Sequence, residues 1–321
     1  MDKKGLDLII DFCVDENFKK NSISHIKNLN RFSLPPNFSV WNIKGSNVSL
    51  AERQINQFDE FRLSHFVNLL KEVASTIKDL NCKIILNLGD EPHTDYKYSS
   101  LCFSCPQNSN HIPIPDPHIF KHINNKGYFS ESFDSERFSN KKNKGYFRGS
   151  DTGQILDNLL NQRILFCNKF KDSDIIDAKI TAFHHFNKAM LAGLGIDINK
   201  ISSNFSSYEE QLQYKYIIDI CGNTAAWDRI AWVTASNSIL IKIKSDECLD
   251  QCWYWPYIRQ NLIVPEIKME KIEKYLSENL NGQEELNNKQ KLTAQNLLLN
   301  KDFHLKYFEK VLVKYNILYN Q

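Results

Sequence analysis

The sequence predicts an α/β fold, because short apolar segments typical of buried strands alternate with segments that have helical spacing. Two stretches in which a strand runs through a glycine turn into a helical pattern, residues 144–153 and 213–229, carry most of this prediction. With 321 residues and a hydrophobic fraction of 42%, the chain is long enough for two domains that each bury a core.

The first part of the chain is predicted to form several strands and one long helix. Residues 6–14 are apolar for only a few positions and are broken by Asp7 and Asp11, which predicts a short first strand or helix and neither a secretory signal nor a membrane span. Further on, the pattern predicts strand material at 38–48, an amphipathic helix at 57–80, and strands at 83–88 and 100–104.

Residues 112–117 contain three prolines and therefore predict an extended crossing, because proline breaks both helices and strand ladders. Residues 124–144 are rich in Asn, Ser, Lys and Gly, which favours an interdomain linker. We therefore predict a first domain at 1–138, a second at 139–280, and a C-terminal segment at 281–321 with helical spacing from 292 to 319.

The stretch 213–229 combines a strand with features that suit an anion. Its apolar run is short and β-branched, and Gly222 can take a backbone conformation closed to other residues. Asn223 or Thr224 then caps a helix whose free N–H groups would face an anion. Arg229, about one and a half turns into that helix, would add the bidentate charge that suits a diphosphate. Taken alone, the pattern favours a plain connection, because it is far looser than a full dinucleotide-binding fingerprint.

The stretch 144–153 repeats this plan. Arg148 comes at the end of a short aromatic strand, just before Gly149, and a helical pattern of apolar residues follows the turn. Ser150 and Thr152 offer hydroxyl groups and caps at the head of that helix. The alternative is an arginine in a surface ion pair beside an ordinary helix cap.

The motifs of these two stretches resemble the CAP10-type glycosyltransferases (glycosyltransferase family 90), a family that includes the Rumi-type protein O-glucosyltransferases and bacterial LpsA-like lipopolysaccharide-modifying proteins. The resemblance covers about residues 80 to 280. It rests on Tyr146-Phe-Arg-Gly-Ser-x-Thr152, Asp177-Ala-Lys-Ile-Thr181, Tyr214-Lys-Tyr216, Gly222-x-x-Ala-x-x-x-Arg229, Ser236-Asn-Ser-Ile-Leu-Ile-Lys242, Trp253-Tyr-Trp255 and Val264-Pro265.

The resemblance implies a GT-B architecture: two Rossmann-like domains face each other across a cleft, and a C-terminal helix returns to the first domain. It implies inverting transfer from a UDP-sugar without a required metal or other cofactor. The UDP-sugar would contact the second domain through Arg148, Gly149, Ser150, Thr152, Tyr216, Gly222, Asn223, Ala226 and Arg229. The family's usual His-Tyr pair before the proline is replaced by Leu262 and Ile263, which leaves the residue that reads the uracil or ribose unassigned.

The resemblance also implies a general base. Inverting transfer needs a group that takes the proton of the acceptor hydroxyl, and a carboxylate at a strand end suits this task. Asp90 follows the strand 83–88 and matches the position of the family's catalytic aspartate. Its neighbour Glu91 is an alternative, and Gly89 departs from the family pattern. Without the resemblance, Asp90 also fits a turn residue that caps a loop.

The net charge and the cysteines indicate which partners, compartment and metals to expect. The net charge of +2 gives no argument for nucleic acid as a partner. Eight cysteines at irregular positions predict reduced thiols and a cytoplasmic enzyme. This favours the bacterial LpsA-like branch of the family, and that resemblance implies peripheral contact with the inner membrane surface, where the branch finds its lipid-linked acceptors. Cys102, Cys105, Cys248 and Cys252 could in principle bind zinc, but the first pair is expected on a strand with its side chains on opposite faces, so we predict no metal.

The sequence thus leads to a UDP-sugar-dependent transferase that acts on a saccharide or lipid-linked saccharide acceptor, in lipopolysaccharide or another surface glycan. One alternative is a catalytically inactive nucleotide-sugar-binding protein on the same fold. A third hypothesis is a phosphotransferase. It is disfavoured because the chain has neither a Gly-Lys-Ser/Thr loop nor a pair of acidic residues for magnesium.

Overall fold

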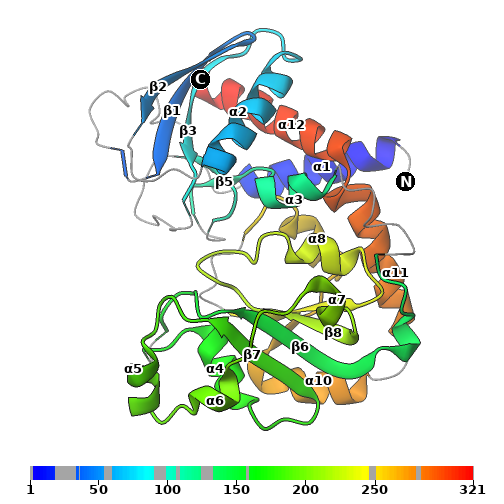
Figure 1. The fold of residues 1–321 in the computed structure, drawn as a ribbon. Helices are drawn as coiled ribbons and strands as arrows, with labels where there is room; N and C mark the ends of the chain where they lie inside the picture. Colours follow the sequence, from blue (N-terminus) through cyan, green and yellow to red (C-terminus); the bar gives the residue numbers. More distant parts are fainter. Residues whose placement is uncertain are drawn as a thin grey trace. The chain divides into compact units, whose positions relative to one another are not determined.

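The computed structural model describes residues 3–18, 34–35, 37–53, 60–89, 99–105, 109–123, 133–156, 159–245, 251–279 and 283–320. Asp90, Glu91 and Cys248 lie outside these ranges. The fold is α/β, as predicted, with two five-stranded sheets (Figure 1). The chain forms two compact units: unit 1 comprises residues 1–124, 249–261 and 296–321, and unit 2 comprises residues 125–248 and 262–295.

The sheet of unit 1 is mixed. Its strands are ordered β2-β1-β3-β4-β5, with β1 antiparallel to β2 and β3, and with β3, β4 and β5 parallel. The expected strand at 38–48 is in fact the start of a hairpin, because Gly45 adopts a φ of 57° and reverses the chain. The bounds are β1 Phe38–Lys44, β2 Asn47–Arg53, β3 Asn81–Asn87, β4 Leu101–Cys102 and β5 Ile112–Pro113.

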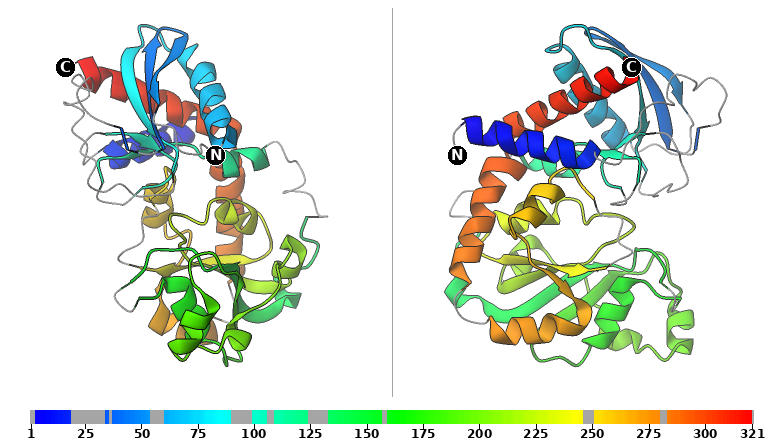
Figure 2. Two further views of the ribbon diagram at one scale, coloured as in Figure 1. Left: turned by 60° about the vertical axis from the view of Figure 1, so that its left-hand side comes forward. Right: turned by 180° about the vertical axis from the view of Figure 1, so that it is seen from behind.

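The last helix belongs to unit 1, where α12 packs against α1, α2 and β3 (Figure 2). Its buried residues recur at helical spacing, as in Phe303, Tyr307 and Val311, which is why this stretch folds onto the unit as a helix. The ring of Trp253 packs against Phe303 and Tyr307, so the Trp253-Tyr-Trp255 motif of the family resemblance is part of the core. The helices are α1 Lys3–Phe18, α2 Glu60–Ala74, α3 Pro117–Ile123, α9 Trp255–Gln260 and α12 Lys301–Asn320.

Two histidines of unit 1, the fully buried His304 and the partly buried His65, make its stability depend on pH. Burial lowers the pKa of His304 to about 3 and that of His65 to about 4. In the unfolded chain a histidine takes up a proton near pH 6.5. As the pH falls below 6.5, the unfolded state therefore binds protons that the folded state does not, and the folded state is destabilised. Above about pH 7 this penalty is absent.

We expect the free energy of unfolding to fall by about 2 kcal/mol per histidine between pH 7 and pH 5, from the slope of about 1.36 kcal/mol per pH unit. Urea unfolding followed by tryptophan fluorescence measures it, since the Trp253 ring lies 4.7 Å from that of His304. His304→Leu should remove about half of the pH dependence, whereas a matched change at the exposed His185 should leave it intact. An unchanged slope in His304→Leu would contradict this account.

The sheet of unit 2 is entirely parallel, in the order β10-β9-β8-β6-β7. The chain crosses from β6 outward to β7 and then returns past β6 to β8, so the strand order reverses between β6 and β8. Figure 1 shows β6, β7 and β8 side by side. The strands are β6 Lys142–Ser150, β7 Ile176–Ala182, β8 Tyr214–Asp219, β9 Ile239–Lys244 and β10 Glu266–Lys268.

Helices cover both faces of this sheet. One face carries an apolar core in which Phe147, Ile180 and Ile218 pack with residues of α4, α6 and α10. Helices α8 and α11 contact β9 and each other, and α8 also contacts β8. The helices are α4 Gln162–Lys169, α5 Lys188–Gly193, α6 Ile198–Ile201, α7 Tyr208–Gln211, α8 Arg229–Thr234, α10 Ile272–Glu278 and α11 Glu284–Thr293, and a π-helix at Ala294–Leu298 precedes α12.

The cysteines differ from the expectation of eight reduced thiols, because Cys221 is disulfide-bonded. Cys105 lies beyond β4, in a bridge with Gln251, and its side chain interacts with that of Cys102, so the two do not lie on one strand. Strand β4 contains only Leu101 and Cys102, so the alternation of side chains between its two faces ends before Cys105. The sequence pattern did not show that the strand is this short. The other cysteines of the described ranges, Cys13, Cys82, Cys102, Cys105, Cys167 and Cys252, are free.

No helix in the described ranges is long and apolar enough to cross a membrane. Nor do the His, Cys, Asp and Glu side chains of those ranges gather in a group of three or more that could hold a metal ion.

Candidate functional site

The carboxyl ends of β6 and β8 meet where the strand order of unit 2 reverses, the place at which open parallel sheets usually bind ligands. Both glycine turns singled out in the sequence lie at this edge. They are directly linked: Arg229 Nη2 donates a hydrogen bond to the carbonyl oxygen of Arg148, at 2.7 Å. The structure therefore brings Arg148, Gly149 and Ser150 of the first turn together with Arg229 of the second.

Arg163, the second residue of α4, makes hydrogen bonds to both turns. Its Nη1 donates to the Ser150 carbonyl at 3.1 Å and to the Thr152 hydroxyl at 2.9 Å, and its Nε and Nη2 donate to the carbonyl of Ile220. Gly222 leaves room for this side chain, since a Cβ there would lie 3.0 Å from Nη2. Gly222 is thus required for a close approach of Arg163, and its φ is not positive.

The guanidinium groups of Arg163 and Arg229 concentrate positive charge at this edge. Burial, together with the nearby charge of Arg229, lowers the pKa of Arg163 to about 10. Arg163 remains a cation at neutral pH. An anion bound between these guanidinium groups would offset their mutual repulsion, which favours a negatively charged ligand.

The buried carboxylate of Asp219, at the end of β8, orients the guanidinium of Arg229. Its oxygens lie 3.6 Å from Arg229 Nη1 and 3.2 Å from Lys242 Nζ. Burial alone would raise the pKa of Asp219, but Lys242, Arg229 and Arg163 together hold it below the ordinary value. Asp219 is therefore an anion that orients Arg229, and its burial keeps it from serving as a base for a substrate.

Arg148 is held in a similar way. Its Nη1 forms an ion pair of 2.9 Å with Asp177 on β7, and its guanidinium stacks on the ring of Tyr146, 4.1 Å from the ring centroid. Nη1 also donates hydrogen bonds to the backbone carbonyls of Phe147 and Asp177. Within the described residues, Nη1 is the only nitrogen of this guanidinium with a polar partner, so the other N–H donors of Arg148 remain for a ligand. Arg148 is thus both oriented and only partly satisfied.

The helices that follow the two turns start later than predicted. Helix α8 begins at Arg229 itself, because Trp227 has a φ of 38° and interrupts helical geometry, so Asn223 and Thr224 do not cap it. Helix α4 begins at Gln162, and its cap is Asn161, which accepts from the N–H of Ile164. The prediction of helix N–H groups facing an anion at these turns is therefore wrong, and the cations are the arginine side chains.

The remaining predicted residues fall into three groups. Asn223 and Ala226 belong to the irregular segment between β8 and α8, where Ala226 accepts a hydrogen bond from the Arg229 N–H. The Ser150 and Thr152 hydroxyls lie 3.0 Å apart within the first turn. Tyr216 lies in the core and its hydroxyl donates to the carbonyl of Asn279, so the structure places it away from this edge.

Asp151 ties the first turn to the loop after β7. Its carboxylate is fully buried and accepts hydrogen bonds from the backbone N–H groups of His184, His185 and Phe186. The carbonyl of Asp151 accepts from the Asn161 amide. The loop that begins at Phe183 is therefore fixed relative to Arg148 and Ser150.

The sequence interpretation missed Arg163, Asp219 and Lys242. Asp219 and Lys242 carry a signal in the sequence, since each is a charged residue inside an otherwise apolar run, as in Ile-Leu-Ile-Lys242-Ile. Charges in apolar runs rarely occur unless they are paired in the fold, so these positions could have been selected. No known family model matches the chain, and no curated protein matches it significantly.

Proposed function

We propose that this protein is an inverting glycosyltransferase of the CAP10 type, with a GT-B architecture, that transfers a sugar from a UDP-sugar to a saccharide acceptor of a surface glycan. One observation carries the proposal. Two glycine turns meet where the strand order of a parallel sheet reverses, and the side chains of Arg163 and Arg229 join them there. These are the positions at which the family resemblance expects the UDP diphosphate.

The arrangement suits departure of a nucleoside diphosphate. When the sugar–phosphate bond breaks, negative charge develops on the leaving diphosphate, and fixed donors there stabilise the transition state more than the ground state. Arg148 and Arg229 are such donors, because Asp177 and Asp219 orient them before any ligand binds. In this proposal they supply the charge that another enzyme would take from a metal ion.

The acceptor side is assigned from the sequence alone. Asp90 takes the proton of the acceptor hydroxyl as its oxygen attacks the anomeric carbon from the face opposite the diphosphate. Its carboxylate lies outside the described residues, so this role depends on the motif at Gly89-Asp90-Glu91-Pro92.

Calorimetric titration of UDP into the protein in EDTA tests the proposal. We expect one site with a dissociation constant in the micromolar range, and weaker binding of inorganic diphosphate, because the nucleoside adds contacts. Heat that appears only after magnesium is added would favour the phosphotransferase reading. Absence of UDP binding in both conditions would refute the proposal.

A further inference from the structure

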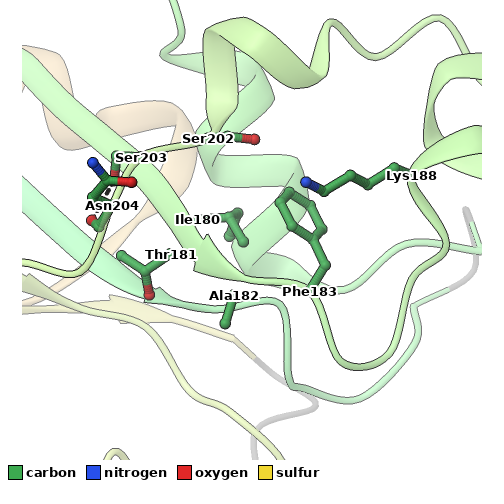
Figure 3. Close-up of a pocket in the computed structure, with 8 residues that line it drawn as sticks. All are labelled: Ile180, Thr181, Ala182, Phe183, Lys188, Ser202, Ser203 and Asn204. Atoms are coloured by element: carbon green, nitrogen blue, oxygen red, sulfur yellow. Dashed lines mark hydrogen bonds between the residues drawn. The ribbon is translucent and has the colours of Figure 1, made fainter.

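A pocket of about 630 Å³ opens at the carboxyl end of β7, next to the strand that carries Arg148. Its walls are the end of β7, the loop that follows it, the first residue of α5, and the segment 202–204 (Figure 3). That segment runs beside β7, since the N–H of Ser203 donates to the carbonyl of Ile180. The volume falls in the range of small-molecule sites, and the proposed diphosphate site does not use it.

The end of the pocket near β6 is polar. Arg148 pairs with Lys179 across the ladder, and Thr181 lies two residues further along β7, at a bulge where the register shifts between Gly149 and Ser150. Figure 3 shows Thr181, Ser203 and Asn204 grouped at this end. Within the described part of the chain, the Thr181 hydroxyl and the Asn204 amide have no hydrogen-bond partner. These groups suit the hydroxyls of a ribose.

The other end combines one aromatic ring with one cation. The Lys188 ammonium lies 5.1 Å from the centroid of the Phe183 ring, and Figure 3 shows the two side by side. The Phe183 ring offers a face on which a planar base can stack. Lys188 only donates hydrogen bonds, so it favours a base edge that presents carbonyl oxygens over one that presents an amino group. Uracil has two such carbonyls.

We propose that this pocket binds the nucleoside of the donor, with the ribose against Thr181 and Asn204, the base on Phe183 and a uracil carbonyl facing Lys188. This inference rests on the proposed function and extends it, since it assigns the contact that selects the base. The loop that carries Phe183 is fixed by Asp151, which begins the turn after Ser150. Base and diphosphate are thereby held at a constant separation.

Calorimetry with UDP, CDP and inorganic diphosphate tests the inference on two variants of the full chain. Phe183→Leu should weaken UDP binding about tenfold and leave inorganic diphosphate unchanged. Lys188→Met should remove most of an about tenfold preference of the wild type for UDP over CDP. Two controls in the same unit remove matched groups that do not line the pocket: Phe205→Leu, at a ring that is 82% exposed, and Lys274→Met, whose side chain is 77% exposed.

The outcomes separate the two proposals. If the wild type binds UDP and both variants bind UDP and CDP as the wild type does, the pocket inference is overturned and the proposed function stands. If the wild type binds neither UDP nor inorganic diphosphate, both fail. Weaker UDP binding in the two pocket variants, with normal binding in the two controls, supports the inference even if one variant is unstable.

Discussion

Replacing Arg229 by methionine should weaken UDP binding at least about 100-fold, the larger of the two binding losses that the site predicts. A guanidinium that makes two charge-assisted hydrogen bonds to a diphosphate contributes about 3 kcal/mol or more, which corresponds to this factor. Arg229 is oriented by Asp219 and by the carbonyl of Arg148, so little entropy is lost when the ligand binds. Calorimetry with UDP measures the effect.

Two variants make the Arg229 result interpretable. Arg229→Lys keeps the charge but loses the planar fork, so we expect an intermediate loss of about tenfold. Arg137→Met removes a charge from an exposed position of unit 2 and should bind UDP normally. Because Arg229→Met leaves Asp219 with Lys242 as its principal partner, a thermal melt must accompany each titration. A folded Arg229→Met protein with wild-type UDP affinity would exclude Arg229 from the site.

Asp90→Asn should reduce sugar transfer at least about 100-fold while UDP affinity stays within about twofold of the wild type. Asparagine keeps the shape of the side chain but cannot accept the proton of the acceptor hydroxyl, and loss of a general base costs about 10²- to 10⁴-fold in rate. Donor binding is assigned to unit 2, which explains the expected split between kcat and affinity. Steady-state transfer kinetics, together with UDP titration of the same preparation, measure both quantities.

The neighbouring carboxylate provides the control for Asp90. Glu91→Gln removes an equal charge one residue later, and its transfer rate should stay close to that of the wild type. If Glu91→Gln instead loses transfer and Asp90→Asn does not, the base is Glu91. Equal, small effects in both variants would remove the base from this segment altogether.

The α/β class could be predicted because it depends on local patterns. Apolar β-branched runs such as that ending at Asp219 form buried strands, and the stripe that includes Phe303 and Tyr307 forms a helix. The hairpin at Gly45 was missed because one glycine between two short strands gives a weak signal. The late starts of α4 and α8 were missed because backbone strain at Trp227 and the cap at Asn161 depend on the packed fold.

Individual residues of the candidate site could be predicted, but the contacts between them could not. Arg148 could be chosen because it stands directly before a glycine turn at the end of a strand, and Arg229 because it follows a second such turn within seven residues. That the two turns touch depends on the strand order, which no local pattern contains. Arg163 was missed for the same reason, since its partners at Ser150 and Ile220 are far from it in the sequence.

The measurement closest to the central claim is release of UDP by the wild-type protein in EDTA, from UDP-glucose, UDP-galactose and UDP-xylose, with the anomeric configuration of the sugar product determined by NMR. We predict release from at least one donor, undiminished by EDTA, and a product of inverted configuration. Absence of release from all three donors with a saccharide acceptor extract present, or a product of retained configuration, would contradict the account.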